Sequence, residues 1–205
     1  QYRRGPVHLA QTMIGRRTTL HCGLLAGLAM VTGLPMALAQ SEGQSQVTVP
    51  PRLRAFFSDP RWVGGQRFTY WGFDVYDASL WANVSFAPED WARQDLILEL
   101  RYLRDFKGLD IAQRSVDEIH KQRALSAEKK QKWFSALQAL IPDVRSGERL
   151  TGVYTPGKGM KLLHQDRTVG EVADAELAQR FFGIWLAAET SQRQLRQRLL
   201  AGAQQ

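Results

Sequence analysis

Arg67 is the residue whose neighbours in the sequence first suggest chemistry. It follows the Gly64–Gly65 pair, and Phe68 and Tyr70 come directly after it. A guanidinium can hold a carboxylate or a phenolate through two parallel hydrogen bonds, and aromatic rings supply apolar surface for the rest of such a ligand. The common alternative is a strand arginine that only faces water. The pattern therefore presents Arg67 as a candidate anion-binding residue.

Other groups that often carry catalysis are sparse. His120 and His164 are the only histidines after residue 39, and neither has acids around it at the spacing of metal ligands. We expect structural or surface roles for both, with no bound metal and no cofactor. The single cysteine, Cys22, lies near the amino end, and the sequence has no P-loop, dinucleotide-binding fingerprint or nucleophile elbow.

Tryptophan is unusually frequent for a chain of this length. All six tryptophans follow residue 39, and four of them lie on faces that we expect to be apolar: Trp71, Trp81, Trp133 and Trp185. Such residues are usually part of a hydrophobic core. They can also line an apolar pocket for an aromatic or acyl ligand, and the sequence leaves both interpretations open.

The elements that must position Arg67 are strands. Aromatic and β-branched residues predict antiparallel strands at 66–71 and 73–82, with a break at Gly72. Further strands are predicted at 52–57, 95–106, 149–154, 160–164 and 168–172. In the 95–106 strand, alternation places Leu98, Leu100 and Tyr102 on one face.

Helical periodicity appears in two separate blocks. Asp110 and Ser126 are the expected amino-terminal caps of the first two helices, and Pro142 ends the second. Asp174 and Ser191 are the expected caps of the last two. The order of strands, two helices, strands and two helices predicts the α+β class, with an antiparallel sheet covered on one side by helices.

The amino end resembles a secretory signal peptide. Arg16 and Arg17 precede an apolar run that closes with small residues, which predicts cleavage after Ala39 and a periplasmic or secreted protein. A retained transmembrane anchor is the alternative, disfavoured by Pro35. Residues 1–39 are thus expected to be removed, 40–51 to form a flexible leader and 52–205 to form the folded domain, with no stable membrane span.

Loss of that segment changes the charge of the chain. Its 39 residues hold four arginines and no acids, so the formal net charge falls from +7 to +3. We therefore expect no binding to nucleic acid.

Several motifs together resemble the bacterial chalcone isomerase-like family. They are GGQRFTYWGFDVYDASLW, LELRYLRDFKG followed by IAQRSVDEI, then Trp133, PDV at 142–144, TGVYTPGKG and FFGIWLAAETS. The resemblance runs from about Val63 to Leu200. It implies a large curved antiparallel sheet with helices layered on one side and a cleft between them.

The resemblance also implies site residues. Plant isomerases of this fold cyclise chalcones: an arginine steadies the anionic substrate, and a threonine and a tyrosine polarise the ketone. Arg67 falls at the position of the arginine, Trp71 at the threonine and Ile111 at the tyrosine, while Glu118 replaces an asparagine and Ser191 matches a polar residue. Apart from the indole N–H, Trp71 and Ile111 donate no hydrogen bond, so enolate stabilisation is expected to be lost.

Our leading hypothesis is an exported, non-catalytic binder of a small amphipathic carboxylate, such as a fatty acid or a phenolic acid. The resemblance supports it, because non-catalytic relatives of this fold bind fatty acids. The expected ligand-binding residues are Arg67, Trp71, Tyr76, Ile111 and Ser191. One alternative is an intramolecular lyase that uses Arg67 with Tyr70, Tyr76 or Tyr102. The other is a periplasmic structural or partner-binding module whose cleft is filled by Trp and Phe. The sequence does not set the oligomeric state.

Overall fold

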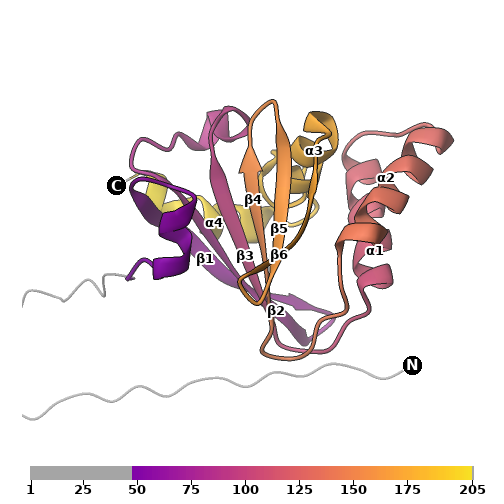
Figure 1. Ribbon diagram of the computed structural model, residues 1–205, viewed down its shortest axis with the longest axis horizontal. Helices are drawn as coiled ribbons and strands as arrows, with labels where there is room; N and C mark the ends of the chain where they lie inside the picture. Colours follow the sequence, from indigo (N-terminus) through magenta and orange to yellow (C-terminus); the bar gives the residue numbers. More distant parts are fainter. Residues whose placement is uncertain (1–47, 205) are drawn as a thin grey trace, which may run out of the picture. The chain divides into compact units, whose positions relative to one another are not determined.

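The computed structural model describes residues 48–204, and its centre is one six-stranded sheet (Figure 1). Every neighbouring pair is antiparallel, and the strands lie in chain order from β1 to β6. Their bounds are β1 Pro60–Tyr70, β2 Phe73–Asn83, β3 Leu96–Tyr102, β4 Arg149–Thr155, β5 Gly159–His164 and β6 Arg167–Val172.

The helices cover one face of this sheet. They are α1 Gly108–Gln122, α2 Ala127–Leu140, α3 Ala175–Leu186 and α4 Arg193–Leu199. Figure 1 shows α1 and α2 side by side, and their buried residues join those of the sheet in one large apolar core. The predicted α+β class, with a curved antiparallel sheet covered on one side by helices, is confirmed.

Two of the four expected helix caps are present. The Ser126 side chain accepts a hydrogen bond from the Lys129 N–H, and Asp174 accepts one from the Leu177 N–H. Asp110 is not a cap, because α1 already begins at Gly108, whose N–H donates to the Asp143 carboxylate at 2.9 Å.

Ser191 is not a cap either. Gln192 precedes α4, and no side chain caps that helix. The Ser191 hydroxyl instead donates to Glu118 at 2.7 Å. A local capping pattern thus gives way to a contact between segments far apart in the chain.

The opposite face of the sheet carries a much smaller apolar cluster. The 3-10 helix η1, Pro51–Ala55, packs there where a strand at 52–57 was expected, so that prediction is wrong. Pro50 and Pro51 favour a helical start, and Leu53 and Phe57, four residues apart, both turn toward the sheet. Two further short 3-10 helices are η2 Pro88–Arg93 and η3 Ala201–Gln204.

The hairpin between β1 and β2 turns at Trp71 and Gly72. Both have left-handed backbones, with φ of 50° and 79°, as in tight two-residue hairpin turns. The Trp71 side chain is 85% exposed, so the expectation of an apolar face for it is wrong. Trp81, Trp133 and Trp185 are buried as expected.

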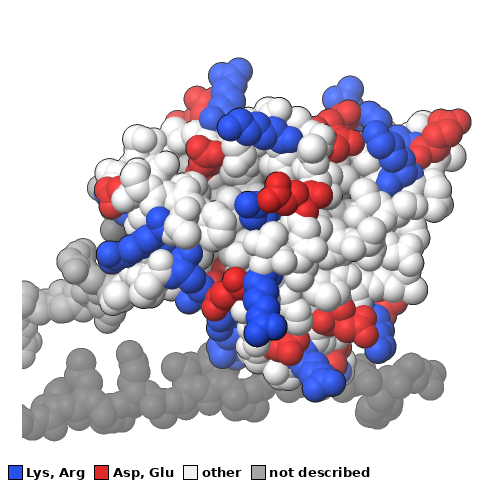
Figure 2. Space-filling model, viewed as in Figure 1, with Lys and Arg blue, Asp and Glu red and all other residues white. Residues whose placement is uncertain are grey.

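Charged side chains of both signs are interspersed on the face of the domain shown in Figure 2. Many are paired, as in the contacts of Lys129 with Glu176 and of Lys130 with Asp117. None of the helices among residues 48–204 is both long enough and apolar enough to cross a membrane. The predicted signal peptide and most of the predicted leader lie outside the described residues, so both stay predictions.

Candidate functional site

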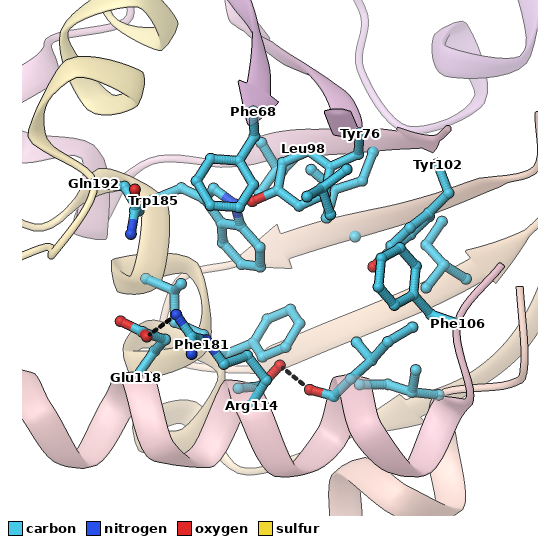
Figure 3. A pocket seen from close by; sticks show the side chains of 18 of the residues that line it. Phe68, Tyr76, Leu98, Tyr102, Phe106, Arg114, Glu118, Phe181, Trp185 and Gln192 are labelled. Carbon is cyan, nitrogen blue, oxygen red and sulfur yellow. Dashed lines mark hydrogen bonds and ion pairs between the residues drawn. The ribbon is translucent and has the colours of Figure 1, made fainter. Parts of the chain in front are cut away.

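A cavity of about 320 Å³ lies between the sheet and the helices (Figure 3). Its floor comes from residues that alternate along β3, β4 and β5, and its roof comes from one face each of α1 and α3. The apolar residues of the floor are Leu98, Leu100, Leu150, Gly152 and Leu162, and those of the roof include Ile111, Phe181, Phe182 and Ile184.

Gly152 gives room for one of these aromatic rings. A Cβ atom at this position would lie 2.9 Å from the tip of the Phe182 ring, which is closer than carbon atoms normally approach. Phe182 itself has no exposed surface and packs at an angle against Tyr154 and Phe181. The smallest residue of β4 therefore sits beneath the Phe182 ring of α3.

A charged cluster forms one side of the cavity. Arg114 and Glu118 lie four residues apart on α1, with the guanidinium Nη2 2.8 Å from the carboxylate (Figure 3). Glu118 also receives hydrogen bonds from Lys121 at 2.9 Å and from Ser191 at 2.7 Å. The Glu118 side chain is only 7% exposed. The carboxylate is thus buried but fully partnered.

These contacts fix the charge of Glu118. Burial disfavours its ionised form, but the hydrogen bonds from Ser191 and Lys121 and the charge of Arg114 outweigh burial, so the pKa of Glu118 lies below its ordinary value. With Lys121, the cluster holds two cations and one anion. Lys121 does not itself line the cavity, so within residues 48–204 the charged side chains that line it are Arg114, Glu118 and Asp110.

Arg114 is the cation that reaches the cavity. Its guanidinium lies 5.2 Å from the centre of the Tyr70 ring, a cation–π contact, and its ion pair with Glu118 is made at Nη2. The other N–H groups have no hydrogen-bond partner among residues 48–204 and are available to an anion. Asp110, in the first turn of α1, also lines the space and lies near Lys107.

Two tyrosines reach the cavity from the sheet. The Tyr76 hydroxyl accepts a hydrogen bond from the Trp185 indole at 3.0 Å, and the Tyr76 and Tyr102 rings meet edge to face. Tyrosine, with an ordinary pKa of about 10, is already protonated at neutral pH. Burial raises the pKa of both hydroxyls well above that value, so both stay neutral in alkaline solution too. Each can therefore donate a hydrogen bond.

The structure brings only some of the expected site residues together. Tyr76 and Ile111 line the cavity, and Ser191 contacts it indirectly through its bond to Glu118. Trp71 is at the exposed hairpin tip and does not line it.

Arg67 requires the main correction. Its side chain does not line the cavity, because Phe68, the next residue of β1, occupies the helix-covered face. The guanidinium of Arg67 pairs with Asp77 at 2.7 Å and Asp74 at 3.1 Å on the other face. Alternation puts neighbouring strand residues on opposite faces, so a one-residue difference in phase separates Arg67 from the cavity.

Arg114 and Tyr102 were missed as principal site residues, although the sequence carried a signal for each. Arg114, Ser115 and Glu118 follow Ile111 at spacings of three, four and seven residues and so share one helical face with it, and all four line the cavity. Tyr102 was placed with Leu98 and Leu100 on one strand face, and this is the face that meets the cavity.

Metal-binding side chains are not grouped. The part of the chain from 48 to 204 contains no set of three or more His, Cys, Asp or Glu residues that could hold a metal ion. His120 accepts a hydrogen bond from the Leu125 N–H, and His164 pairs with Glu148 at 2.9 Å. Both histidines therefore have structural partners.

Comparison with known proteins gives one similar sequence and one similar fold. An uncharacterized protein of Haemophilus influenzae is 28% identical over 138 residues, which are 67% of this chain and 66% of that protein, so the chain spans just under two thirds of it. The crystal structure of a fatty-acid binding protein of Arabidopsis thaliana superposes with a TM-score of 0.55 at 14% identity, covering 76% of this chain and 96% of that one. This second likeness shows a shared fold.

The family model described as chalcone isomerase-like matches residues 64–201, which include every strand residue and helix residue that lines the cavity. The sheet, the helix layer and the cavity between them agree with the fold that the sequence motifs implied. The chain belongs to the chalcone isomerase-like family.

Proposed function

We propose that this protein binds a small amphipathic carboxylate, a fatty acid or a phenolic acid, in the cavity and releases it unchanged. The observation that carries this proposal is the pairing of an apolar cavity with the Arg114 guanidinium at its side. Ligand pockets are typically apolar with a few placed polar groups, and their volumes begin at about 300 Å³. The cavity has this composition and lies at the small end of that range.

The free donors of Arg114 favour an anion. Arg114 is the one cation that lines the cavity within residues 48–204, and its guanidinium keeps N–H groups beside the apolar space in addition to the one at the Glu118 ion pair. A planar guanidinium offers two parallel N–H groups that match the two oxygens of a carboxylate. The acyl or aromatic part of the ligand would then cover the leucine floor, gaining about 0.8 kcal/mol for each CH₂ group removed from water.

The fold of the Arabidopsis fatty-acid binding protein supports the same ligand class by analogy. The cavity also argues against an interior filled wholly by Trp and Phe side chains, which was the structural alternative.

Native mass spectrometry of the full chain tests the proposal. We expect dodecanoic acid to add to the protein as one bound molecule. Ile111→Trp should remove this binding, because residue 111 lines the cavity and the larger ring would occupy it. Leu109→Trp is the matched control, since Leu109 lies on the same helix but is half exposed and outside the cavity. Equal binding by both variants would place the ligand elsewhere.

A second candidate function is an intramolecular lyase of the chalcone isomerase type. It is favoured by the hydroxyls of Tyr76 and Tyr102, which reach the cavity as neutral donors. Two such donors at a ketone oxygen would stabilise the enolate that forms when a phenolate attacks an enone. Arg114 would hold the phenolate.

A chalcone assay separates the two functions. Loss of the chalcone absorbance in the presence of the protein, abolished by Tyr76→Phe and Tyr102→Phe together, would establish turnover. Binding of a hydroxychalcone without a change in absorbance would exclude lyase activity on this compound and would agree with a binding function.

We further propose export, on the sequence of residues 16–39 alone. Amino-terminal sequencing of protein recovered from the periplasm should begin at Gln40. Recovery of an uncleaved chain in the membrane fraction would favour an anchor.

A further inference from the structure

The Tyr102 hydroxyl has no role in the binding of a plain fatty acid. β3 places this side chain on the helix-covered face of the sheet, where it is only 4% exposed. Its ring packs against those of Tyr76 and Phe106, with centres 5.8 Å and 5.6 Å away. These contacts hold the ring in place and leave its polar end at the cavity.

The hydroxyl oxygen has no hydrogen-bond partner among residues 48–204. Figure 3 shows this oxygen turned toward the space between the labelled side chains. Tyr154 provides the contrast, because its hydroxyl donates to the Ala92 carbonyl at 2.8 Å and it does not line the cavity. The Tyr102 oxygen is not among the fully enclosed unpaired atoms of the described residues, so it borders open space, and water or a ligand in the cavity supplies its partner.

Arg114 and Tyr102 enter the cavity from different layers. Arg114 comes from α1 in the roof and Tyr102 from β3 in the floor, and Figure 3 shows apolar side chains, including Phe181, in the region between them. A ligand that uses both groups must therefore carry two polar functions separated by an apolar portion. A saturated fatty acid has only one.

We propose that Tyr102 is a second hydrogen-bonding point of the cavity, and that the ligand is an oxygenated amphipathic acid. Such a ligand carries a hydroxyl or ketone oxygen along its chain in addition to the carboxylate that Arg114 holds. This inference rests on the proposed function and narrows its ligand class.

The preference follows from desolvation. A plain acyl chain displaces water from the Tyr102 hydroxyl and returns no hydrogen bond, whereas an oxygen at that position restores one. The hydroxyl is protonated at neutral pH, as any tyrosine hydroxyl with a pKa of about 10 or more is, so it can donate to the ligand oxygen. We expect the matching oxygenated acid to bind about tenfold more tightly than its plain counterpart.

Calorimetric titration of the full chain tests this. The probes are dodecanoic acid and a series of hydroxydodecanoic acids, with the hydroxyl moved one carbon at a time from the middle to the end of the chain. At least one hydroxy acid should exceed dodecanoic acid by about tenfold in affinity. Tyr102→Phe, which keeps the ring, should reduce this ratio to about one. Tyr154→Phe should keep the wild-type ratio.

The outcomes separate the two proposals. If dodecanoic acid binds but no hydroxy acid is preferred, or if Tyr102→Phe keeps the preference, this inference fails and carboxylate binding stands. If the wild-type chain binds none of the acids, fatty-acid binding as the proposed function fails and this inference fails with it. Circular dichroism of both variants establishes that a changed ratio reflects the hydroxyl and not the fold.

Discussion

The two faces of the sheet use arginine in different ways. On the outer face, Arg67 and Arg101 share the carboxylate of Asp77, and both guanidinium groups are about half exposed. On the helix-covered face, Arg114 contacts a carboxylate that is almost fully buried and lies beside an apolar cavity. All three arginine side chains are about half exposed, so the difference lies in their partners: the Glu118 carboxylate is 7% exposed and that of Asp77 is 27% exposed, and water screens the more exposed carboxylate better. The same side-chain type is therefore a surface ion pair on one face and a candidate ligand anchor on the other.

The buried apolar clusters on the two faces also differ, and the larger one lies beneath the helices. The outer cluster has six buried members, centred on Trp81 and Ile97, whereas the core beneath the helices extends across every strand from β1 to β5. This comparison predicts that stability, ligand binding and acid sensitivity are all dominated by the helix-covered face.

Removal of a roof side chain gives the largest expected effect. Phe182→Ala deletes a ring with no exposed surface and should lower the free energy of unfolding by about 3–5 kcal/mol. Denaturant titration measures this loss. Leu163→Ala, in the outer cluster, is the comparison and should cost about 2 kcal/mol. An equal loss in the two variants would remove the energetic distinction between the faces.

Acid titration sharpens the comparison further. Folding lowers the pKa of Glu118 below its unfolded value of about 4.3, so the ionised carboxylate stabilises the fold above that pH, and this stabilisation is lost as the pH falls through the folded pKa. Glu118→Gln should cost about 1–2 kcal/mol at pH 7 and should make the loss of stability below about pH 4 shallower.

Asp77→Asn is the matched variant on the outer face. Hydrogen bonding to Arg67 lowers the pKa of Asp77, so its contribution has the same sign. Because the Asp77 side chain is more exposed than that of Glu118, we expect less than about 1 kcal/mol. Denaturant unfolding at several pH values compares the stability of the Glu118→Gln and Asp77→Asn variants. A larger effect of Asp77→Asn would show that the outer face dominates acid sensitivity.

The hairpin tip gives the smallest expected effect, and it has the opposite sign. Trp71 has a left-handed backbone that bulky residues rarely adopt, and its side chain is exposed. Trp71→Asn suits this turn and should raise the unfolding free energy by about 0.5–1 kcal/mol without changing carboxylate affinity. A loss of carboxylate affinity in this variant would show that the hairpin tip takes part in ligand binding.

Much of the fold could be predicted from the sequence, because its signals are local. Period-two alternation in the 95–106 run and the caps at Ser126 and Asp174 depend on neighbouring residues only. The segment 52–57 was misassigned because Leu53 and Phe57 suit a strand as well as a helical turn, and only their contact with the sheet decides between them.

The site was harder to predict, because it depends on register. Whether Arg67 or Phe68 faces the helices is settled by the irregular pairing near Gly64 and by Phe68 lying opposite Tyr76, and neither feature is visible in composition. Ser191 shows the same limit. Its local pattern predicts a cap, while its actual partner, Glu118, lies 73 residues away in the chain.

The central claim is that Arg114, and not Arg67, holds the carboxylate of the ligand. The most direct test is the dissociation constant for dodecanoic acid measured with the wild-type chain, Arg114→Ala and Arg67→Ala. We predict that Arg114→Ala weakens binding at least about tenfold, since a charge-assisted hydrogen bond is lost, and that Arg67→Ala leaves it unchanged. Weakened binding in Arg67→Ala with wild-type binding in Arg114→Ala would contradict this account.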